Sequence, residues 1–237
     1  MDSKFGFLAK LEFLQSWASR LIAGVNPAVI HNIEKYYTLK KVHYLSAIEN
    51  ISGDYLEFGV FTGSSFCHSI RCNQKLRYLN PLVGEKRFFG FDSFCGFGEI
   101  DDDEKHPFYT DENFETDKDK VERRVKKIAK DTQFTLVPGY FSDSLAAGPE
   151  SFGIQKSSII FIDSDTYSSS KEALDFCDKT LQLGTFIILD DYYSYKGSSK
   201  KGVKKAFDEF KERNQIKLRR VFTYGMGGAV FIISETI

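Results

Sequence analysis

The spacing of apolar residues changes about fifty residues into the chain. Before that point, apolar side chains recur at three- and four-residue steps, at Phe7, Leu11, Leu14, Trp17 or Ala18, Leu21 and Val25. This period is typical of an amphipathic helix. Because Asn26-Pro27 can stop one helix and start the next, the pattern predicts helices over residues 5–24 and 27–50. We expect the first helix to pack on its own domain or on a second copy of the chain, as in a homodimer.

Seven short apolar or β-branched runs follow, and each predicts a strand. They are Asp54–Val60, Arg87–Asp92, Gln133–Val137, Ser158–Asp163, Thr185–Asp190, Lys217–Thr223 and Ala229–Ser234. The first five are separated by segments long enough for helices, such as Ser64–Leu79, Lys118–Lys130 and Ser169–Leu181. This alternation predicts a mostly parallel sheet covered on both faces. The last two runs are joined by Tyr224–Gly228, a turn too short for a helical crossover, so they should pair antiparallel.

Composition and charge indicate one water-soluble α/β domain. The 237 residues are 42% hydrophobic and 27% charged, and 32 basic residues nearly cancel 33 acidic ones. We expect a single domain over 1–237, with a helical extension at 1–50 and an α/β core at 54–237. A nucleic-acid partner would need a clustered basic face, and a membrane helix would need about 20 apolar residues in a row. Neither feature is predicted.

The four cysteines give no sign of disulfides or of a metal quartet. Cys67, Cys72, Cys95 and Cys177 lack CxxC spacing and are too sparse for a disulfide scaffold. We therefore expect reduced thiols in a cytoplasmic protein.

A glycine turn follows the first predicted strand. The segment Asp54–Gly63 reads DYLEFGVFTG and leads into Ser64-Ser65, where a helix should begin. Glycines let the backbone approach a ligand closely, and a helix N-terminus offers free N–H groups. The GxxxG spacing differs from the GxGxxG of dinucleotide enzymes, which makes an NAD-dependent oxidoreductase the weaker hypothesis. Alone, the pattern also fits an ordinary turn.

An acid ends the second predicted strand. In RFFGFD, Asp92 is well placed to accept hydrogen bonds from a ribose diol. A strand-terminal turn residue is the alternative. The combination with the glycine turn favours a nucleoside site.

Two apolar strands end in pairs of aspartates. Asp163 and Asp165 follow one in SIIFIDSDTY, and Asp190 and Asp191 follow the next in TFIILDDY. The carboxyl ends of consecutive parallel strands meet at one edge of a sheet. Clustered carboxylates repel one another unless a cation lies between them, and oxygen ligands favour Mg²⁺, Mn²⁺ or Ca²⁺ over zinc. We predict a divalent-cation site there; turn formers or helix caps are the alternative.

The stretch Glu99–Lys120 is acidic, polar and without apolar periodicity. It predicts either a solvated loop or a mobile lid over a site, since long loops in compact domains often carry function. Among the scattered histidines, His106 in this stretch is the one we expect to face a ligand.

These motifs together resemble the macrocin O-methyltransferase family, whose members use S-adenosylmethionine (SAM) to methylate sugar hydroxyls in natural products. The matching blocks occur in family order over roughly residues 54–210: YLEFGVFTGSS, GFDSFCGF, VPGYFSDSL, IDSDTYSSS, GTFIILDDYYSYKG and GVKKAFDEF. The resemblance implies a Rossmann-like class I methyltransferase fold. Such a fold has a seven-stranded, mostly parallel sheet with a C-terminal antiparallel pair, preceded here by the helical extension.

The resemblance also implies roles for individual residues. SAM would be the co-substrate, with Mg²⁺ or a similar divalent cation. Asp92 would hold the ribose, and Asp165 would be the general base. The other SAM-binding residues would be Glu57, Gly59, Thr62, Gly63, Ser64, Ser93, Phe94, Tyr140, Phe141, Ser142 and Asp163. The cation ligands would be Asp163, Asp190 and Asp191.

The sequence departs from the family pattern at two places. Cys95, Gly96 and Phe97 replace an acid and a Gly-Leu-Pro run, and Ser168–Ser170 replaces Glu-Ser-Thr. These changes bear on the acceptor more than on the chemistry, which we expect to be methylation of a hydroxyl on a small molecule such as a sugar. Two alternatives stay open. One is a haloacid-dehalogenase-like phosphatase, because IDSDT resembles its DxD motif; the other is a non-catalytic SAM-binding domain.

Overall fold

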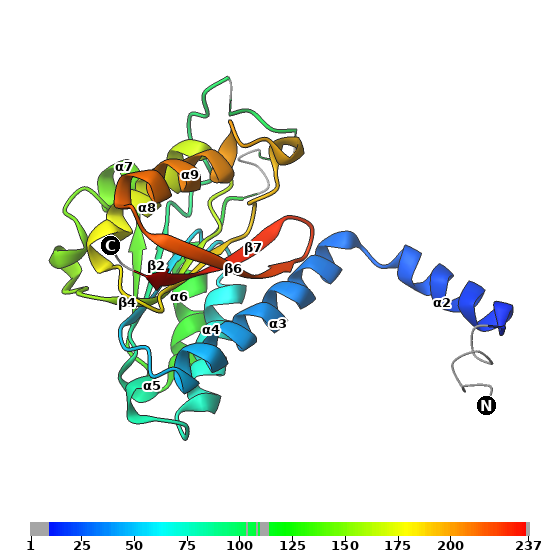
Figure 1. The fold of residues 1–237 in the computed structure, drawn as a ribbon, viewed down its shortest axis with the longest axis horizontal. Helices are drawn as coiled ribbons and strands as arrows, with labels where there is room; N and C mark the ends of the chain where they lie inside the picture. The colour runs from blue at the N-terminus through cyan, green and yellow to red at the C-terminus, as the bar shows by residue number, and fades with distance from the viewer. Residues whose placement is uncertain (1–9, 103, 108, 110–113, 236–237) are drawn as a thin grey trace.

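A seven-stranded sheet forms the centre of the molecule (Figure 1). The computed structural model describes residues 10–102, 104–107, 109 and 114–235. The strands are β1 (Asp54–Phe58), β2 (Phe88–Asp92), β3 (Phe134–Pro138), β4 (Ser157–Ile162), β5 (Phe186–Leu189), β6 (Lys217–Tyr224) and β7 (Gly228–Glu235). Their order across the sheet is β3-β2-β1-β4-β5-β7-β6. β7 runs antiparallel to both of its neighbours, and the other pairs are parallel. All seven predicted strands are confirmed to within two residues at each end.

Helices cover both faces of the sheet. They are α2 (Glu12–Gly24), α3 (Pro27–Ile48), α4 (Ser64–Leu76), α5 (Pro81–Glu85), α6 (Lys118–Ala129), α7 (Phe141–Ser144), α8 (Tyr167–Cys177) and α9 (Gly202–Asn214), with 3₁₀ turns at Pro149–Phe152, Asp178–Thr180 and Tyr195–Gly197. The helices α5, α7 and α9 were not predicted from the sequence. Residues 5–9 of the first predicted helix lie outside the described residues.

Alternate residues of each central strand face two separate hydrophobic clusters. In β4, Ile159 and Phe161 pack with side chains of α3, α4 and α6, whereas Ile160 and Ile162 pack with α8 and α9. Because both faces are buried, residues 159–162 of β4 and all of β5 are apolar rather than alternating with polar residues. The same arrangement leaves the strand ends as the place where polar side chains can gather.

The register of β1, β4 and β5 aligns the residues that follow them. Phe58 pairs with Ile162, and Ile162 pairs with Leu189. The ladder continues one residue further, since Asp163 N donates to Phe58 O at 2.8 Å and Asp190 N donates to Ile162 O at 3.0 Å. The two aspartates therefore leave adjacent strands at the same level, as the strand-end argument predicted.

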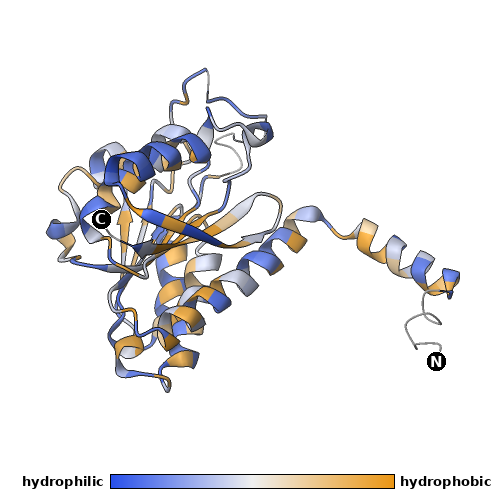
Figure 2. Ribbon diagram, viewed as in Figure 1, coloured by the Kyte–Doolittle hydropathy of each residue, from blue (hydrophilic) through white to orange (hydrophobic). Residues whose placement is uncertain are grey.

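The helix α2 extends away from the rest of the molecule (Figure 1). Of its residues Glu12–Gly24, all of which are described, none is buried. The structure therefore does not show this helix packing on its own domain, one of the two outcomes we expected. Figure 2 shows apolar residues along it and along neighbouring α3. In the described part of the chain, no helix has the length and apolarity to cross a membrane.

Candidate functional site

Two adjoining clefts open at the carboxyl edge of the sheet. The glycine-turn cleft is lined by Gly59, Phe61, Asp92, Ser93, Gly96, Phe97, Phe114, Tyr140, Phe141, Asp163, Ser164, Asp165 and Ser169. The acidic cleft has a volume of about 620 Å³, and its walls include Ala28, His31, Asn32, Lys35, Thr62, Ser64, His106, Tyr109, Asp190, Asp191, Tyr193, Ser194, Met226 and Gly227. Both clefts are lined by Gly59, Phe61, Phe114, Asp163 and Asp165.

Gly59 sits where β1 and β4 end side by side. Its φ is +94°, and a Cβ built on it would lie 1.9 Å from the carbonyl oxygen of Asp163. A side chain is therefore excluded both by the backbone conformation and by the neighbouring strand. Gly59 lines both clefts, and the absence of a side chain there leaves space where the two clefts adjoin.

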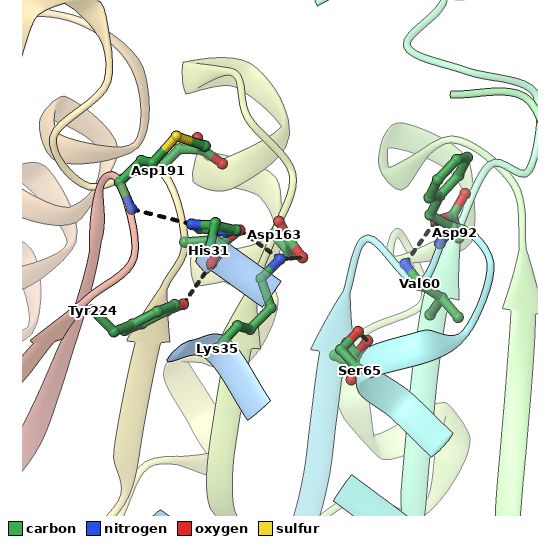
Figure 3. A network of polar contacts seen from close by, with 12 residues as sticks. His31, Lys35, Val60, Ser65, Asp92, Asp163, Asp191 and Tyr224 are labelled. Carbon is green, nitrogen blue, oxygen red and sulfur yellow. Dashed lines mark hydrogen bonds and ion pairs between the residues drawn. The ribbon is translucent and has the colours of Figure 1, made fainter. Parts of the chain in front are cut away.

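Asp92 fixes the turn after β1. Its Oδ2 accepts hydrogen bonds from Val60 N and Phe61 N, each at 2.7 Å, and its Oδ1 accepts one from Phe94 N at 2.6 Å (Figure 3). Burial raises the pKa of Asp92, while these three donors act in the opposite direction. Asp92 also lines the glycine-turn cleft, and a carboxylate with three donors can still accept a hydrogen bond from a ligand hydroxyl.

The other predicted SAM-binding residues fall into four groups. Ser93, Tyr140 and Phe141 line the glycine-turn cleft, and Thr62 and Ser64 line the acidic cleft. Gly63, with φ +75°, caps α4, and Phe94 is buried, so neither lines a cleft wall. Ser142 borders a separate hollow beside Glu172 and Lys179.

Glu57 lies behind the glycine turn and is fully buried. It accepts hydrogen bonds from the Tyr55 hydroxyl and, at 2.5 Å, from Ser65 Oγ in the first turn of α4. Burial raises its pKa to about 7. The structure thus places Glu57 where it supports the turn rather than where it lines a cleft.

Three carboxylates meet in the acidic cleft. Asp163, Asp190 and Asp191 each offer an oxygen, and these oxygens lie within 4.8 Å of one another. Asp165 lies in the same cleft with φ +62°, in the left-handed region that aspartate adopts more readily than most residues other than glycine. An all-oxygen donor set of this size suits Mg²⁺ or a similar hard cation.

Two side chains of α3 reach the same carboxylates (Figure 3). Lys35 Nζ lies 2.9 Å from Asp163 Oδ2 and 2.6 Å from Asp190 Oδ2. His31 Nε2 lies 3.1 Å from Asp190 Oδ2. The helix therefore brings one formal positive charge into the cluster.

The charges shift the pKa values of the aspartates in opposite directions. Burial, and then repulsion from Asp190, raises the pKa of Asp163 well above its usual value. Burial, and then repulsion from Asp191, does the same to the pKa of Asp165. Burial is the largest single influence on Asp190 and acts to raise its pKa, but attraction to Lys35 and the hydrogen bond from His31 together outweigh it, and the pKa is lowered. Of Asp163, Asp165 and Asp190, it is therefore Asp190 that holds its negative charge most firmly.

Hydroxyl groups hold the other oxygens of Asp190 and Asp191. Tyr224 donates to Asp190 Oδ1 at 2.6 Å. Tyr109 and Ser194 donate to Asp191 Oδ1 at 3.1 and 3.0 Å. Tyr109 belongs to the predicted acidic loop, as does His106, which stacks on it and lines the acidic cleft. Residues 103, 108 and 110–113 of that loop lie outside the described residues.

The contributions of His31, Lys35, Tyr109 and Tyr224 to this site were not predicted from the sequence. A signal for two of them was available in α3. His31, Lys35 and Leu39 recur at four-residue steps, and Val42 continues the same face three residues later. A lysine within a buried helical face needs a partner of opposite charge, which points to the aspartates.

One family model and several known methyltransferases are similar to this chain. A family model described as Macrocin-O-methyltransferase (TylF) matches residues 33–223. Mycinamicin III 3''-O-methyltransferase of Micromonospora griseorubida is 27% identical over 181 residues, covering 70% of this chain and 66% of that protein. The 8-demethyl-8-(2,3-dimethoxy-alpha-L-rhamnosyl)-tetracenomycin-C 4'-O-methyltransferase of Streptomyces olivaceus is 27% identical over 184 residues, covering 73% and 67%. The chain thus spans about two thirds of the length of these relatives.

Solved structures share the fold at low sequence identity. The calicheamicin methyltransferase CalS11 is 18% identical with a TM-score of 0.67, covering 98% of this chain and 94% of that one. The O-methyltransferase TomG from Streptomyces achromogenes, solved in complex with SAM, is 13% identical with a TM-score of 0.51, covering 84% and 80%. The predicted Rossmann-like class I methyltransferase fold is confirmed. With its motifs in family order and a family match over most of its length, the chain belongs to the macrocin-O-methyltransferase family.

Proposed function

We propose that this chain is a SAM-dependent O-methyltransferase, folded as one domain, that methylates a hydroxyl on a sugar or glycosylated natural product with the help of a divalent cation. One observation carries the proposal: the glycine-turn cleft and the acidic cleft share Gly59, Asp163 and Asp165. A methyl donor in the first cleft and an acceptor in the second would meet at these residues. Family membership favours this activity over the phosphatase alternative.

The glycine-turn cleft suits the nucleoside part of SAM. Asp92 can accept hydrogen bonds from ribose hydroxyls, and Phe97, Tyr140 and Phe141 offer aromatic surface to an adenine ring. TomG, a protein of the same fold, has been solved with SAM bound. These features support SAM as the co-substrate.

The acidic cleft suits a divalent cation, with Mg²⁺ as our choice. Asp163, Asp190 and Asp191 would hold it, because their oxygens converge and no softer ligand is among them. When bound, the cation would lower the pKa of an acceptor hydroxyl. Lys35 must then give up its two close contacts with the aspartates.

Asp165 is the group we propose as general base. It lies in both clefts, and its raised pKa makes it a better proton acceptor than an exposed aspartate. The acceptor hydroxyl would give its proton to the carboxylate, and its oxygen would form a bond to the methyl carbon. The carbon–sulfur bond would break, leaving its electron pair on sulfur as the neutral thioether product. Aligning oxygen, carbon and sulfur would supply several kcal/mol of the acceleration.

The acceptor class follows from the cleft and from the relatives. A volume of about 620 Å³ can hold a sugar ring with part of an aglycone. His106, Tyr109 and Tyr193 add aromatic and hydrogen-bonding groups to its wall. One relative is named as acting on a rhamnosyl group. These features support a glycoside acceptor.

We also propose an oligomeric state and a cellular location for this protein. The stripe of exposed apolar residues on α2 supports a homodimer, because a second copy would supply a matching surface. All four cysteines are free thiols, which supports a reducing, cytoplasmic location.

The test combines binding and turnover on the full chain. We expect SAM, but not NAD, to raise the melting temperature, and we expect methyl transfer from labelled SAM to a panel of glycosides to require Mg²⁺. Asp191→Asn should reduce turnover by about 10²-fold or more while SAM binding persists. Asp175→Asn, at a half-exposed position on α8, is the matched control. Undiminished transfer by Asp191→Asn, or in the presence of a chelator, would exclude the cation.

A further inference from the structure

Lys35 lies where the proposed cation would bind. Its Nζ contacts Asp163 and Asp190, two of the three converging carboxylates, at 2.9 and 2.6 Å. Its side chain is only 11% exposed, so water does little to screen these contacts. A divalent cation coordinated by the same oxygens could not share this position with an ammonium group.

Lys35 is the only formal positive charge that we find facing these carboxylates among the described residues. His31 accepts a hydrogen bond from Met226 N at its Nδ1, at 3.2 Å, so its Nε2 carries the ring proton and donates to Asp190. Histidine in this tautomer is neutral. Tyr109, Ser194 and Tyr224 are neutral donors as well. One ammonium therefore balances a cluster to which four aspartates contribute.

We propose that Lys35 is a built-in competitor for the divalent cation: its ammonium occupies the aspartate site until the cation displaces it. The inference rests on the proposed function, because it assumes that Asp163, Asp190 and Asp191 bind a cation. The chain has room for the exchange, because Lys35 and Asn32 border the acidic cleft and the lysine stem is flexible.

The helix itself can stay in place while the lysine moves. Glu34 accepts a hydrogen bond from Gly225 N at 2.6 Å, and His31 holds both Met226 N and Asp190. These contacts fix α3 to the β6–β7 turn independently of Lys35. A displaced ammonium would then enter the acidic cleft, where it can donate hydrogen bonds to an acceptor hydroxyl. Cation binding and acceptor binding would thereby be coupled.

The first measurement is Mn²⁺ affinity by electron paramagnetic resonance. Lys35→Met removes the competing charge and keeps most of the stem, so Mn²⁺ should bind roughly tenfold more tightly or better. Lys35→Gln, which retains a hydrogen-bond donor, is the second variant in case the first does not fold. Lys40→Met, at an exposed position on the same helix, should bind like the wild type. Equal or weaker binding by both Lys35 variants would overturn the inference while leaving the cation site intact.

The second measurement follows Lys35 itself. Reductive methylation of the wild-type chain, read by mass spectrometry, should modify Lys35 severalfold faster with saturating Mg²⁺ than without it. Modification of Lys40 should not change. Protection of Lys35 that is unaffected by Mg²⁺ would refute displacement. If neither the wild type nor any Lys35 variant binds Mn²⁺, the cation proposal fails and the competitor role fails with it.

Discussion

Asp165 combines three properties that a general base needs. It borders both clefts, its backbone lies in the left-handed region at a φ of +62°, and burial raises the pKa of its carboxyl. Aspartate and asparagine tolerate this backbone conformation better than most residues do. A substitution by asparagine can therefore test the proton transfer without disturbing the turn.

Asp165→Asn should lower kcat by about 10²–10⁴-fold, because the amide cannot accept the acceptor's proton. The dissociation constant for SAM should stay within a few-fold of the wild-type value. Single-turnover methyl transfer and calorimetric titration with SAM measure the two quantities. If Asp165→Asn retains most of the wild-type kcat, another residue must be the general base.

A second prediction concerns Lys86, which is buried far from the clefts. Its Nζ donates to Ser46 Oγ at 3.2 Å, and burial lowers its pKa from 10.5 to about 7. Below pH 7 the folded and unfolded states both carry the charge, so the cost of burying it is present in full. As the pH rises from 7 towards 10.5, only the folded state has released the proton, and the cost fades.

Lys86→Met should therefore stabilise the fold by roughly 1–3 kcal/mol below pH 7, with a gain that shrinks as the pH rises. Urea unfolding of both proteins between pH 6 and pH 9.5 measures the difference. Lys130→Met, at an exposed position, controls for loss of charge alone. A stabilisation by Lys86→Met that increases with pH would contradict the prediction that the charged form of buried Lys86 destabilises the fold.

At the scale of elements, the strands and the strand-end aspartates could be predicted because they depend on local patterns. Runs such as IIFI are apolar throughout, and an acid that follows one can be recognised without knowledge of the tertiary structure. The contacts of Lys35 with Asp163 and of His31 with Asp190 join residues 128 and 159 positions apart. No local pattern encodes such a distance. The helix α9 was missed because Val203, Phe207 and Phe210 lie within a lysine-rich run.

The glycine turn gives a prediction at this scale. Gly59→Ala should destabilise the fold by at least about 2 kcal/mol, because the new Cβ meets the Asp163 carbonyl and φ is positive. If the Gly59→Ala protein folds, it should bind SAM and the cation more weakly, because residue 59 lines both clefts. Gly84→Ala is the control, because nothing lies within 4 Å of its added Cβ. Thermal unfolding of the two variants compares them; equal melting temperatures would refute the steric argument.

At the scale of the whole molecule, the exposed apolar surface of α2 (Glu12–Gly24) has no counterpart to pack on within the described part of one chain. Phe13, Trp17 and Leu21 are 69%, 63% and 54% exposed on α2, and Ile33 and Tyr37 extend the apolar surface onto α3. A 13-residue helix is marginally stable in water without tertiary packing. We therefore expect the exposed apolar residues of α2 to pack against another surface, and a second copy of the chain presents the same apolar residues.

A charge on this stripe should dissociate the dimer. Trp17→Glu combined with Leu21→Glu places two carboxylates in the proposed contact, where each would be buried without a partner. Ser19→Glu adds a charge on the opposite side of the same helix and should leave the dimer intact. Light scattering coupled to size exclusion should give the mass of two chains for the wild type and for Ser19→Glu, and about 27.1 kDa for the double variant. Because the lining of the glycine-turn cleft includes no residue of α2 or α3, the dissociated chain should still bind SAM. A wild-type mass of one chain would mean that α2 has another partner.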